Sequence, residues 1–219
     1  MATLAVLPMK SFSQAKHRLR NELSAGDRRA LVEAMFCDVL IALRRAAAVA
    51  RVVVVSADRG AQQIAVGYGA TVVSDAERGH NHAATVGVRA VLELGGDRAL
   101  LVPGDCPAVS PGDLDALIAR PAAPRSVLIV PDRHGTGTNA LLLTPPDALA
   151  TSFGAGSRRR HVTAAAGKNV EAEVVEVGSL AMDVDTPDDL ATLRRALSSS
   201  HGGAPHTRGL LTQLVRSRA

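Results

Sequence analysis

Short β-branched segments alternate with helical patterns along most of this 219-residue sequence, and this alternation constrains the fold more than any other feature. TLAVLPM (3–9) precedes a helical pattern over 23–47, and RVVVVSA (51–57) precedes another over 58–69. This rhythm is typical of βαβ units, which build parallel sheets with helices on both faces. We therefore predict an α/β protein, a three-layer α/β/α sandwich with a Rossmann-like, mostly parallel sheet.

The first long helix illustrates how its ends and faces are predicted. Ser24 and Asp27 have the spacing of a capping box, and apolar residues recur from Leu31 to Leu43 at helical intervals. The far side of this helix carries polar residues, including Asp38. We expect that side to be the polar one.

The distribution of charge argues against nucleic acid as a partner. The formal charge is +4, but residues 198–219 hold three arginines and no acidic residue, which leaves about +1 for residues 1–197. Aromatic residues make up 2% of the chain, too few for base-stacking platforms. We predict one domain over 1–197, followed by a flexible basic tail over 198–219 that ends the chain.

Several further features favour a cytoplasmic protein without a membrane partner. Cys37 and Cys106 form no CxxC pair and suggest no disulfide framework. No apolar run approaches 18 residues, and the first ten residues read as a strand rather than as a signal peptide.

Two segments at predicted strand ends carry aspartates suited to Mg²⁺. Asp183 and Asp185 are two residues apart, so in an extended segment they point to the same side, and Asp105 follows another apolar strand. Thr186 can cap the next helix, with Pro187 at its first position. The alternative is that these acidic residues only serve turns and the helix start. Three aspartates at two strand ends favour the metal site.

Basic and glycine-rich loops follow other predicted strands. The loop after the first strand carries Lys10, Lys16, Arg18 and Arg20, which suit a triphosphate, although a solvated basic loop is the alternative. It lacks the P-loop pattern, so we do not expect an ATPase. The loops DRHGTGTN (132–139) and FGAGSRRRH (153–161) bring glycines and hydroxyls that suit an anion, or form ordinary turns. In the second loop three arginines and His161 are available to that anion.

Taken in order, PMKSFSQAKHRLR, GDCP, DRHGTGTN, FGAGSRRRH and DVDTPDDL resemble the CofC/FbiD family, over about residues 3–197. These MobA-like nucleotidyltransferases are phospholactate and phosphoenolpyruvate guanylyltransferases of coenzyme F-420 biosynthesis, with a sheet of the GT-A type. The resemblance implies a role for each candidate residue. The metal ligands are Asp105, Asp183 and Asp185, the acid is held by Thr138, Gly154 and Ser157, the triphosphate faces Lys10, Lys16 and Arg18, and Asn81 contacts the nucleoside.

The resemblance also implies the reaction. A phosphate oxygen of phosphoenolpyruvate attacks the α-phosphorus of GTP, pyrophosphate leaves, and the three aspartates and Lys16 are the catalytic residues. The partners are then GTP and a small phosphorylated acid, and a homodimer is possible. 2-Phospho-L-lactate and 3-phosphoglycerate remain alternative acceptors; the Ala- and Arg-rich composition suggests a bacterial genome and favours phosphoenolpyruvate. Another GT-A-like transferase, a nucleotide-binding regulator and a nucleic-acid binder are the competing functions.

Overall fold

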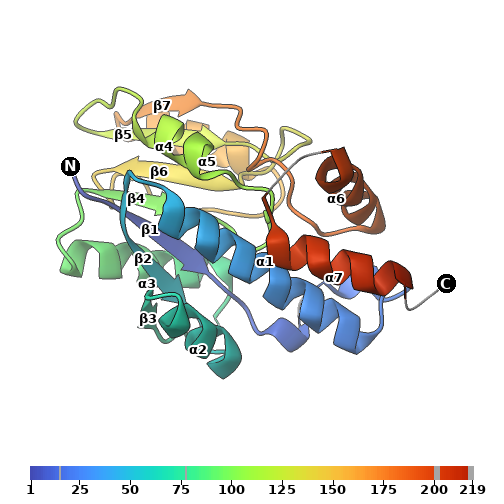
Figure 1. The fold of residues 1–219 in the computed structure, drawn as a ribbon. Coiled ribbons are helices and arrows are strands. Elements are labelled where there is room, and N and C mark those ends of the chain that lie inside the picture. Colours follow the sequence, from blue (N-terminus) through green and yellow to red (C-terminus); the bar gives the residue numbers. More distant parts are fainter. Residues whose placement is uncertain (15, 77, 200–202, 217–219) are drawn as a thin grey trace.

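The fold is a seven-stranded sheet between two layers of helices, as seen in the computed structural model, which describes residues 1–14, 16–76, 78–199 and 203–216 (Figure 1). The strands follow the order β3-β2-β1-β4-β6-β5-β7 across the sheet. The strands are β1 (Thr3–Pro8), β2 (Val49–Val55), β3 (Thr71–Val73), β4 (Arg98–Leu101), β5 (Ser126–Val130), β6 (Ala140–Thr144) and β7 (Glu171–Val174). All described strands run parallel except β6, which is antiparallel to both of its neighbours.

Helices cover both faces of this sheet, because the strands present apolar side chains to both faces. In β1, Ala5 and Leu7 belong to one core, whereas Leu4 and Val6 belong to the other. The described helices are α1 (Ala25–Arg45), α2 (Arg59–Gly67), α3 (His80–Glu93), α4 (Pro111–Ile118), α5 (Ser157–Ala166), α6 (Pro187–Ser199) and α7 (Pro205–Arg216), with short 3₁₀ turns η1 (Phe12–Gln14) and η2 (His17–Leu19). The predicted three-layer α/β sandwich is confirmed.

Capping side chains begin the helices where the sequence predicts. The Ser24 hydroxyl accepts a hydrogen bond from the Asp27 amide at 3.1 Å, and the same contact at α4 joins Ser110 to Asp113. On α3, a Cβ added to Gly87 would lie 2.2 Å from a methyl group of Val6, so a glycine is needed for this close approach to β1. The starts of α1 and α4 are therefore fixed by local capping contacts.

The C-terminal segment differs from the expected flexible tail. Residues Pro205–Arg216 form α7, which packs against α1 and buries Thr207, Leu211 and Leu214 (Figure 1). The carboxylate of Asp38, predicted to lie on the polar side of α1, is buried instead and accepts hydrogen bonds from the His206 and Thr207 amides at 3.0 and 2.8 Å. One helix thus caps another. Residues 200–202 and 217–219 of the predicted tail lie outside the described residues.

No helix within the described residues combines the length and the apolar composition that a membrane crossing requires.

Candidate functional site

A cavity of about 540 Å³ lies at the carboxyl ends of β1 and β4, where ligands bind in open α/β sheets. It gathers side chains from loops that are far apart in the sequence. Among the residues predicted from the sequence, its lining includes Lys10, Lys16, Arg18, Asp105, Gly154 and Asp185. The structure therefore brings the basic loop, two of the three aspartates and the glycine loop to one place.

Lys16 lies between two of the predicted metal ligands. Its ammonium donates to Asp105 and, at 2.8 Å, to Asp185, and its side chain is 6% exposed. Burial alone would lower the pKa of Lys16, but the Asp105 and Asp185 carboxylates outweigh burial and raise that pKa above its ordinary value. Lys16 therefore stays protonated and carries a positive charge at the centre of the cleft.

Asp183 is held by a residue that the sequence analysis missed. Buried Asn139, just before β6, donates its side-chain amide to Asp183 at 3.1 Å and to the Leu180 carbonyl at 2.7 Å. Burial raises the pKa of Asp183, and the neighbouring Asp105 carboxylate raises it further. The only sequence signal for Asn139 was its place directly after the T-G-T segment.

The oxygen ligands present here fit a hard divalent cation, although they are not yet arranged as a cage. One carboxylate oxygen of Asp105 is buried and has no hydrogen-bond partner among the described residues, and a bound cation would satisfy it. Within the described ranges, no three His, Cys, Asp or Glu side chains already form a metal-binding group. Lys16 occupies the space between Asp105 and Asp185, so metal binding requires that its side chain shift.

The helix start after Asp185 has the predicted capping geometry. Asp189 accepts from the Thr186 amide at 2.7 Å, and the Thr186 hydroxyl accepts from the Asp189 amide at 3.3 Å. Arg133 pairs with Asp188 and Asp189 at 2.8 and 2.6 Å and so ties the β5–β6 loop to α6. The Asp183–Asp185 segment is therefore held at its carboxyl end by the cap of α6.

His161 sets the direction of the hydrogen bond at Thr138. The His161 ring is fully buried, and its Nε2 accepts from the Ser152 amide at 2.9 Å. Burial and the nearby Arg160 lower the pKa of His161 to about 4, so the ring is neutral at pH 7. A neutral ring that accepts at Nε2 carries its proton on Nδ1, which donates to the Thr138 hydroxyl at 3.1 Å. The Thr138 hydroxyl hydrogen is thus free for another acceptor.

This geometry corrects the expectation that His161 and the arginines are free to bind an anion. His161 is neutral and faces Thr138 rather than the solvent. Arg160 donates to the Ser152 and Phe153 carbonyls, at 2.9 and 3.3 Å, and so fastens the loop before α5. Only Arg158 and Arg159 of the three are left exposed without a described side-chain hydrogen bond.

The loop before α5 needs glycine and leaves a hydroxyl unpaired. Gly154 has φ 113°, a conformation that L side chains rarely adopt, and it reaches the cavity lining. The Ser157 hydroxyl is buried and has no hydrogen-bond partner among the described residues. No side chain caps α5, and the Ser157 and Arg158 amides at its start donate to the Gly154 and Thr136 carbonyls at 3.0 and 3.2 Å. Thr138 and Ser157 lie outside the cavity lining itself.

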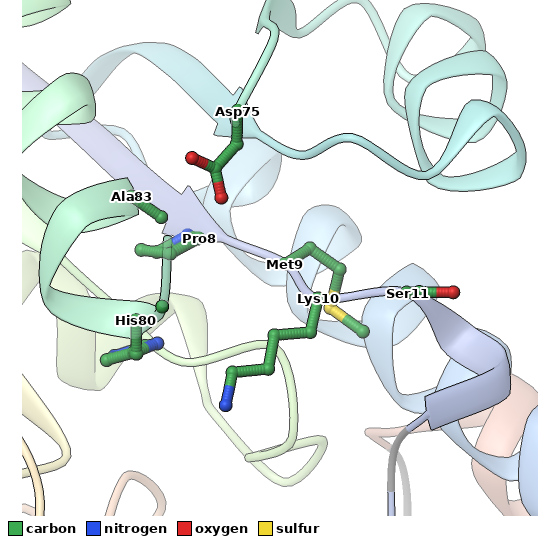
Figure 2. Close-up of a pocket in the computed structure, with 8 residues that line it drawn as sticks. Pro8, Met9, Lys10, Ser11, Asp75, His80 and Ala83 are labelled. Atoms are coloured by element: carbon green, nitrogen blue, oxygen red, sulfur yellow. The ribbon is translucent and has the colours of Figure 1, made fainter. Parts of the chain in front are cut away.

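Asn81 joins two loops instead of lining the cavity. Its side chain accepts from the Phe153 amide at 2.6 Å and donates to the Phe153 carbonyl at 3.2 Å. Its neighbour His80 does line the cavity, with its ring edge-on to Phe153. A second cavity of about 220 Å³ shares Pro8, Met9, Lys10 and His80 with the first, and its lining includes Asp75 (Figure 2).

The sheet order gives the chain a fold of the nucleotidyltransferase type. A solved structure described as a nucleotidyl transferase from Methanothermobacter thermautotrophicus superposes with a TM-score of 0.64 at 19% identity, covering 91% of this chain and 99% of that one. At this identity the likeness concerns the fold alone.

Sequence comparison then identifies the family. The family model described as "Guanylyl transferase CofC like" matches residues 3–216, and the chain belongs to this family. It is 53% identical to the phosphoenolpyruvate guanylyltransferase of Conexibacter woesei, over 99% of this chain and 98% of that protein. It is also 34% identical to the 3-phospho-D-glycerate guanylyltransferase of Colwellia psychrerythraea, over 91% of this chain and 94% of that protein. The match runs through α7, beyond the predicted boundary at residue 197.

Proposed function

We propose that this protein transfers GMP from GTP to the phosphate of phosphoenolpyruvate, giving enolpyruvoyl-2-diphospho-5'-guanosine and pyrophosphate. The observation that carries the proposal is the cavity in which Lys10, Lys16 and Arg18 face Asp105 and Asp185, in a chain that is 53% identical to a phosphoenolpyruvate guanylyltransferase. Anionic substrates and a charged leaving group need such a cluster of cations.

The reaction forms one P–O bond and breaks another. A phosphate oxygen of phosphoenolpyruvate attacks the α-phosphorus of GTP in line, and the bond from that phosphorus to the bridging oxygen of the β-phosphate breaks. Because a phosphate is already anionic at neutral pH, the step requires no general base. Lys16, Lys10 and Arg18 stabilise the negative charge that develops on pyrophosphate.

We assign the metal-binding role to Asp105, Asp183 and Asp185. Mg²⁺ bound there would neutralise phosphate charge and orient the two reacting groups. The buried, unpartnered oxygen of Asp105 supports this assignment. In the bound state Lys16 turns from the carboxylates to the phosphates, which replaces one pair of charge-assisted hydrogen bonds by another.

The acid is assigned to the loops before β6 and α5. Its carboxylate accepts from the free hydroxyl hydrogen of Thr138, from the unpaired hydroxyl of Ser157 and from the backbone amide of Gly154. Phosphoenolpyruvate is the chosen acceptor because the 53% identical relative bears that name, whereas the relative named for 3-phospho-D-glycerate is 34% identical. We place the reaction in coenzyme F-420 biosynthesis, in the cytoplasm.

Pyrophosphate release tests this function directly. The protein is incubated with GTP and Mg²⁺ and, separately, phosphoenolpyruvate, 2-phospho-L-lactate or 3-phosphoglycerate, with ATP and CTP as nucleotide controls. Release that requires both GTP and phosphoenolpyruvate is the expected result. No release from folded protein with any acid would refute the proposal, and sugar phosphates would then be tested as acceptors of a sugar nucleotidyltransferase.

A further inference from the structure

The smaller cavity beside the cleft holds a carboxylate that the proposed reaction does not use. Asp75 follows β3, and its side chain points into the cavity, toward the wall formed by Pro8 and Ala83 (Figure 2). One of its carboxylate oxygens is buried and has no hydrogen-bond partner among the described residues. A buried acceptor without a partner is costly for a folded protein, so a bound ligand is expected to satisfy it.

Asp58, on the neighbouring strand end, shows what a purely structural aspartate looks like in this part of the molecule. One of its oxygens accepts from the Ala61 amide at 3.1 Å, and the other accepts from the Phe12 amide and the Ser11 hydroxyl, both at 3.1 Å. Both oxygens of Asp58 are thus used to cap α2 and hold η1. Among the described residues, the Asp75 side chain makes no hydrogen bond that caps a helix or holds a loop.

The shape and the position of the cavity suit a nucleobase. Its volume of about 220 Å³ is below the range of about 300–1,000 Å³ typical of whole-ligand pockets, so it holds part of a ligand. It opens onto the residues it shares with the larger cavity, where the triphosphate is assigned. Pro8 and Ala83 provide apolar surface for a flat ring, and Asp75 provides an acceptor for the edge of that ring.

The chemistry of the bases singles out guanine. A carboxylate accepts two parallel hydrogen bonds and donates none. Guanine presents two adjacent donors, N1–H and the 2-amino group, whereas adenine and cytosine each place a ring acceptor beside their amino group. A carboxylate therefore attracts the guanine edge and repels the other two edges.

We propose that Asp75 selects the nucleotide by accepting both hydrogen bonds from the Watson–Crick edge of guanine in this cavity. This inference rests on the proposed function for the identity of the nucleotide site, and it names the residue that sets the base preference. A carboxylate that contacted the ribose instead would act equally on every nucleotide, which separates the two roles experimentally.

Asp75→Asn gives the sharpest test, because it keeps the size of the side chain and changes one acceptor into a donor. Xanthine keeps N1–H but carries a carbonyl in place of the 2-amino group, so it matches the acceptor and donor of an asparagine. We expect kcat/KM of Asp75→Asn for GTP to fall about 100-fold, which is the contribution of a good bidentate base contact, and kcat/KM for XTP to rise. Inosine triphosphate, which lacks the 2-amino group, should be poorer than GTP for the unmodified protein and better than GTP for Asp75→Asn, because it presents no second donor to the asparagine amide.

Asp97→Asn is the matched control, since Asp97 is exposed and directly precedes the amino end of β4, whereas the cleft lies at the carboxyl end of that strand, and it should change no preference. Direct binding of GTP and XTP without an acid, measured by calorimetry, separates this inference from the proposed function. A preference that switches in binding while no acid supports turnover would support the inference and refute the function. Turnover with phosphoenolpyruvate, combined with equal losses for all nucleotides in Asp75→Asn, would overturn the inference alone.

Discussion

The two sides of the cleft are built in different ways. The half to which we assign the nucleotide, called the nucleotide half, comprises residues 8–14, 16–20, 75–76 and 78–83. Its Lys10 and Arg18 side chains are exposed, and one Asp75 oxygen has no hydrogen-bond partner among the described residues. The half to which we assign the acid, called the acid half, comprises residues 131–139 and 152–161 and is tied together by hydrogen bonds. His161 joins Thr138 to Ser152, and Arg160 fastens the backbone between Ser152 and Phe153.

This difference matches the ligand that each half would recognise in the proposed reaction. Coulomb attraction to a triphosphate falls slowly with distance, so exposed cations attract it without a fixed geometry. Hydrogen bonds weaken steeply with angle, and a small acid offers few groups by which it differs from its competitors. A hydroxyl with a preset direction, like that of Thr138, therefore serves selection on the acid half. Lys16 and the aspartates lie between the two halves and serve both.

Asp185→Asn should have the largest effect, because it removes a charge from this shared centre. We expect kcat to fall about 1,000-fold, the upper range for losing one preorganised electrostatic contact, and the protein to stay folded with a small fall in the melting temperature, since the Asp185 side chain is 53% exposed but pairs with the buried Lys16. Pyrophosphate release and thermal unfolding measure the two quantities. Asp188→Asn, at a 75% exposed side chain of the same segment, should leave kcat unchanged. Full activity of Asp185→Asn would remove the metal site from the proposed mechanism.

The acid half should also respond to pH through His161. Its pKa is about 4 in the folded protein, against an ordinary 6.5, so the unfolded chain binds more protons between these values. Stability is therefore lost as the pH falls from 6.5 to 4, by about 3 kcal/mol in the free energy of unfolding. Urea unfolding at pH 7 and pH 4.5 measures this loss, which should be smaller in His161→Gln. An equal loss in both proteins would show that another group causes it.

Much of the fold and of the cleft could be predicted from the sequence, because these features depend on patterns of neighbouring residues. Strand and helix periods predicted the α/β sandwich, and the placement of polar residues after strands predicted that the Lys16 and Asp185 segments meet. Ser24 and Thr186 predicted the starts of their helices, because a capping side chain contacts a residue only three positions further along the chain.

Contacts between segments that are distant in the sequence were harder to predict. Asp38 occupies a position of α1 that a helical pattern assigns to the polar side, and only the docking of α7 buries it. The spacing of Thr207, Leu211 and Leu214 is helical, but the serines and glycines before it and its arginines favoured a tail. His161 presents the same difficulty. Its neighbours are three arginines, and nothing in that run indicates that the ring turns inward to Thr138.

Thr138→Val tests whether the acid half acts as one unit. Removing the hydroxyl should raise the KM for phosphoenolpyruvate about 10-fold, the worth of one hydrogen bond to a charged group, and leave the KM for GTP unchanged. His161→Gln should have a smaller effect on the same KM, and the double variant should be no worse than Thr138→Val alone if the effect of His161 on the acid passes through that hydroxyl rather than through its bond to the Ser152 amide. Steady-state kinetics of the three variants measure this. Additive effects would show that His161 acts independently.

Lys10→Ala should have the smallest effect and shows the looseness of the nucleotide half. As an exposed cation Lys10 contributes up to about 1 kcal/mol, so the KM for GTP should rise up to about fivefold and the KM for the acid should not change. Added salt should weaken GTP binding to the unmodified protein more than to Lys10→Ala, because screening removes the same attraction. Arg20→Ala is the matched control: Arg20 is an exposed cation of the same loop outside both cavity linings, and its loss should change neither KM. A larger effect of Lys10→Ala that resisted salt would mean that Lys10 is fixed in the bound state, and that the nucleotide half is as tightly organised as the acid half once GTP is present.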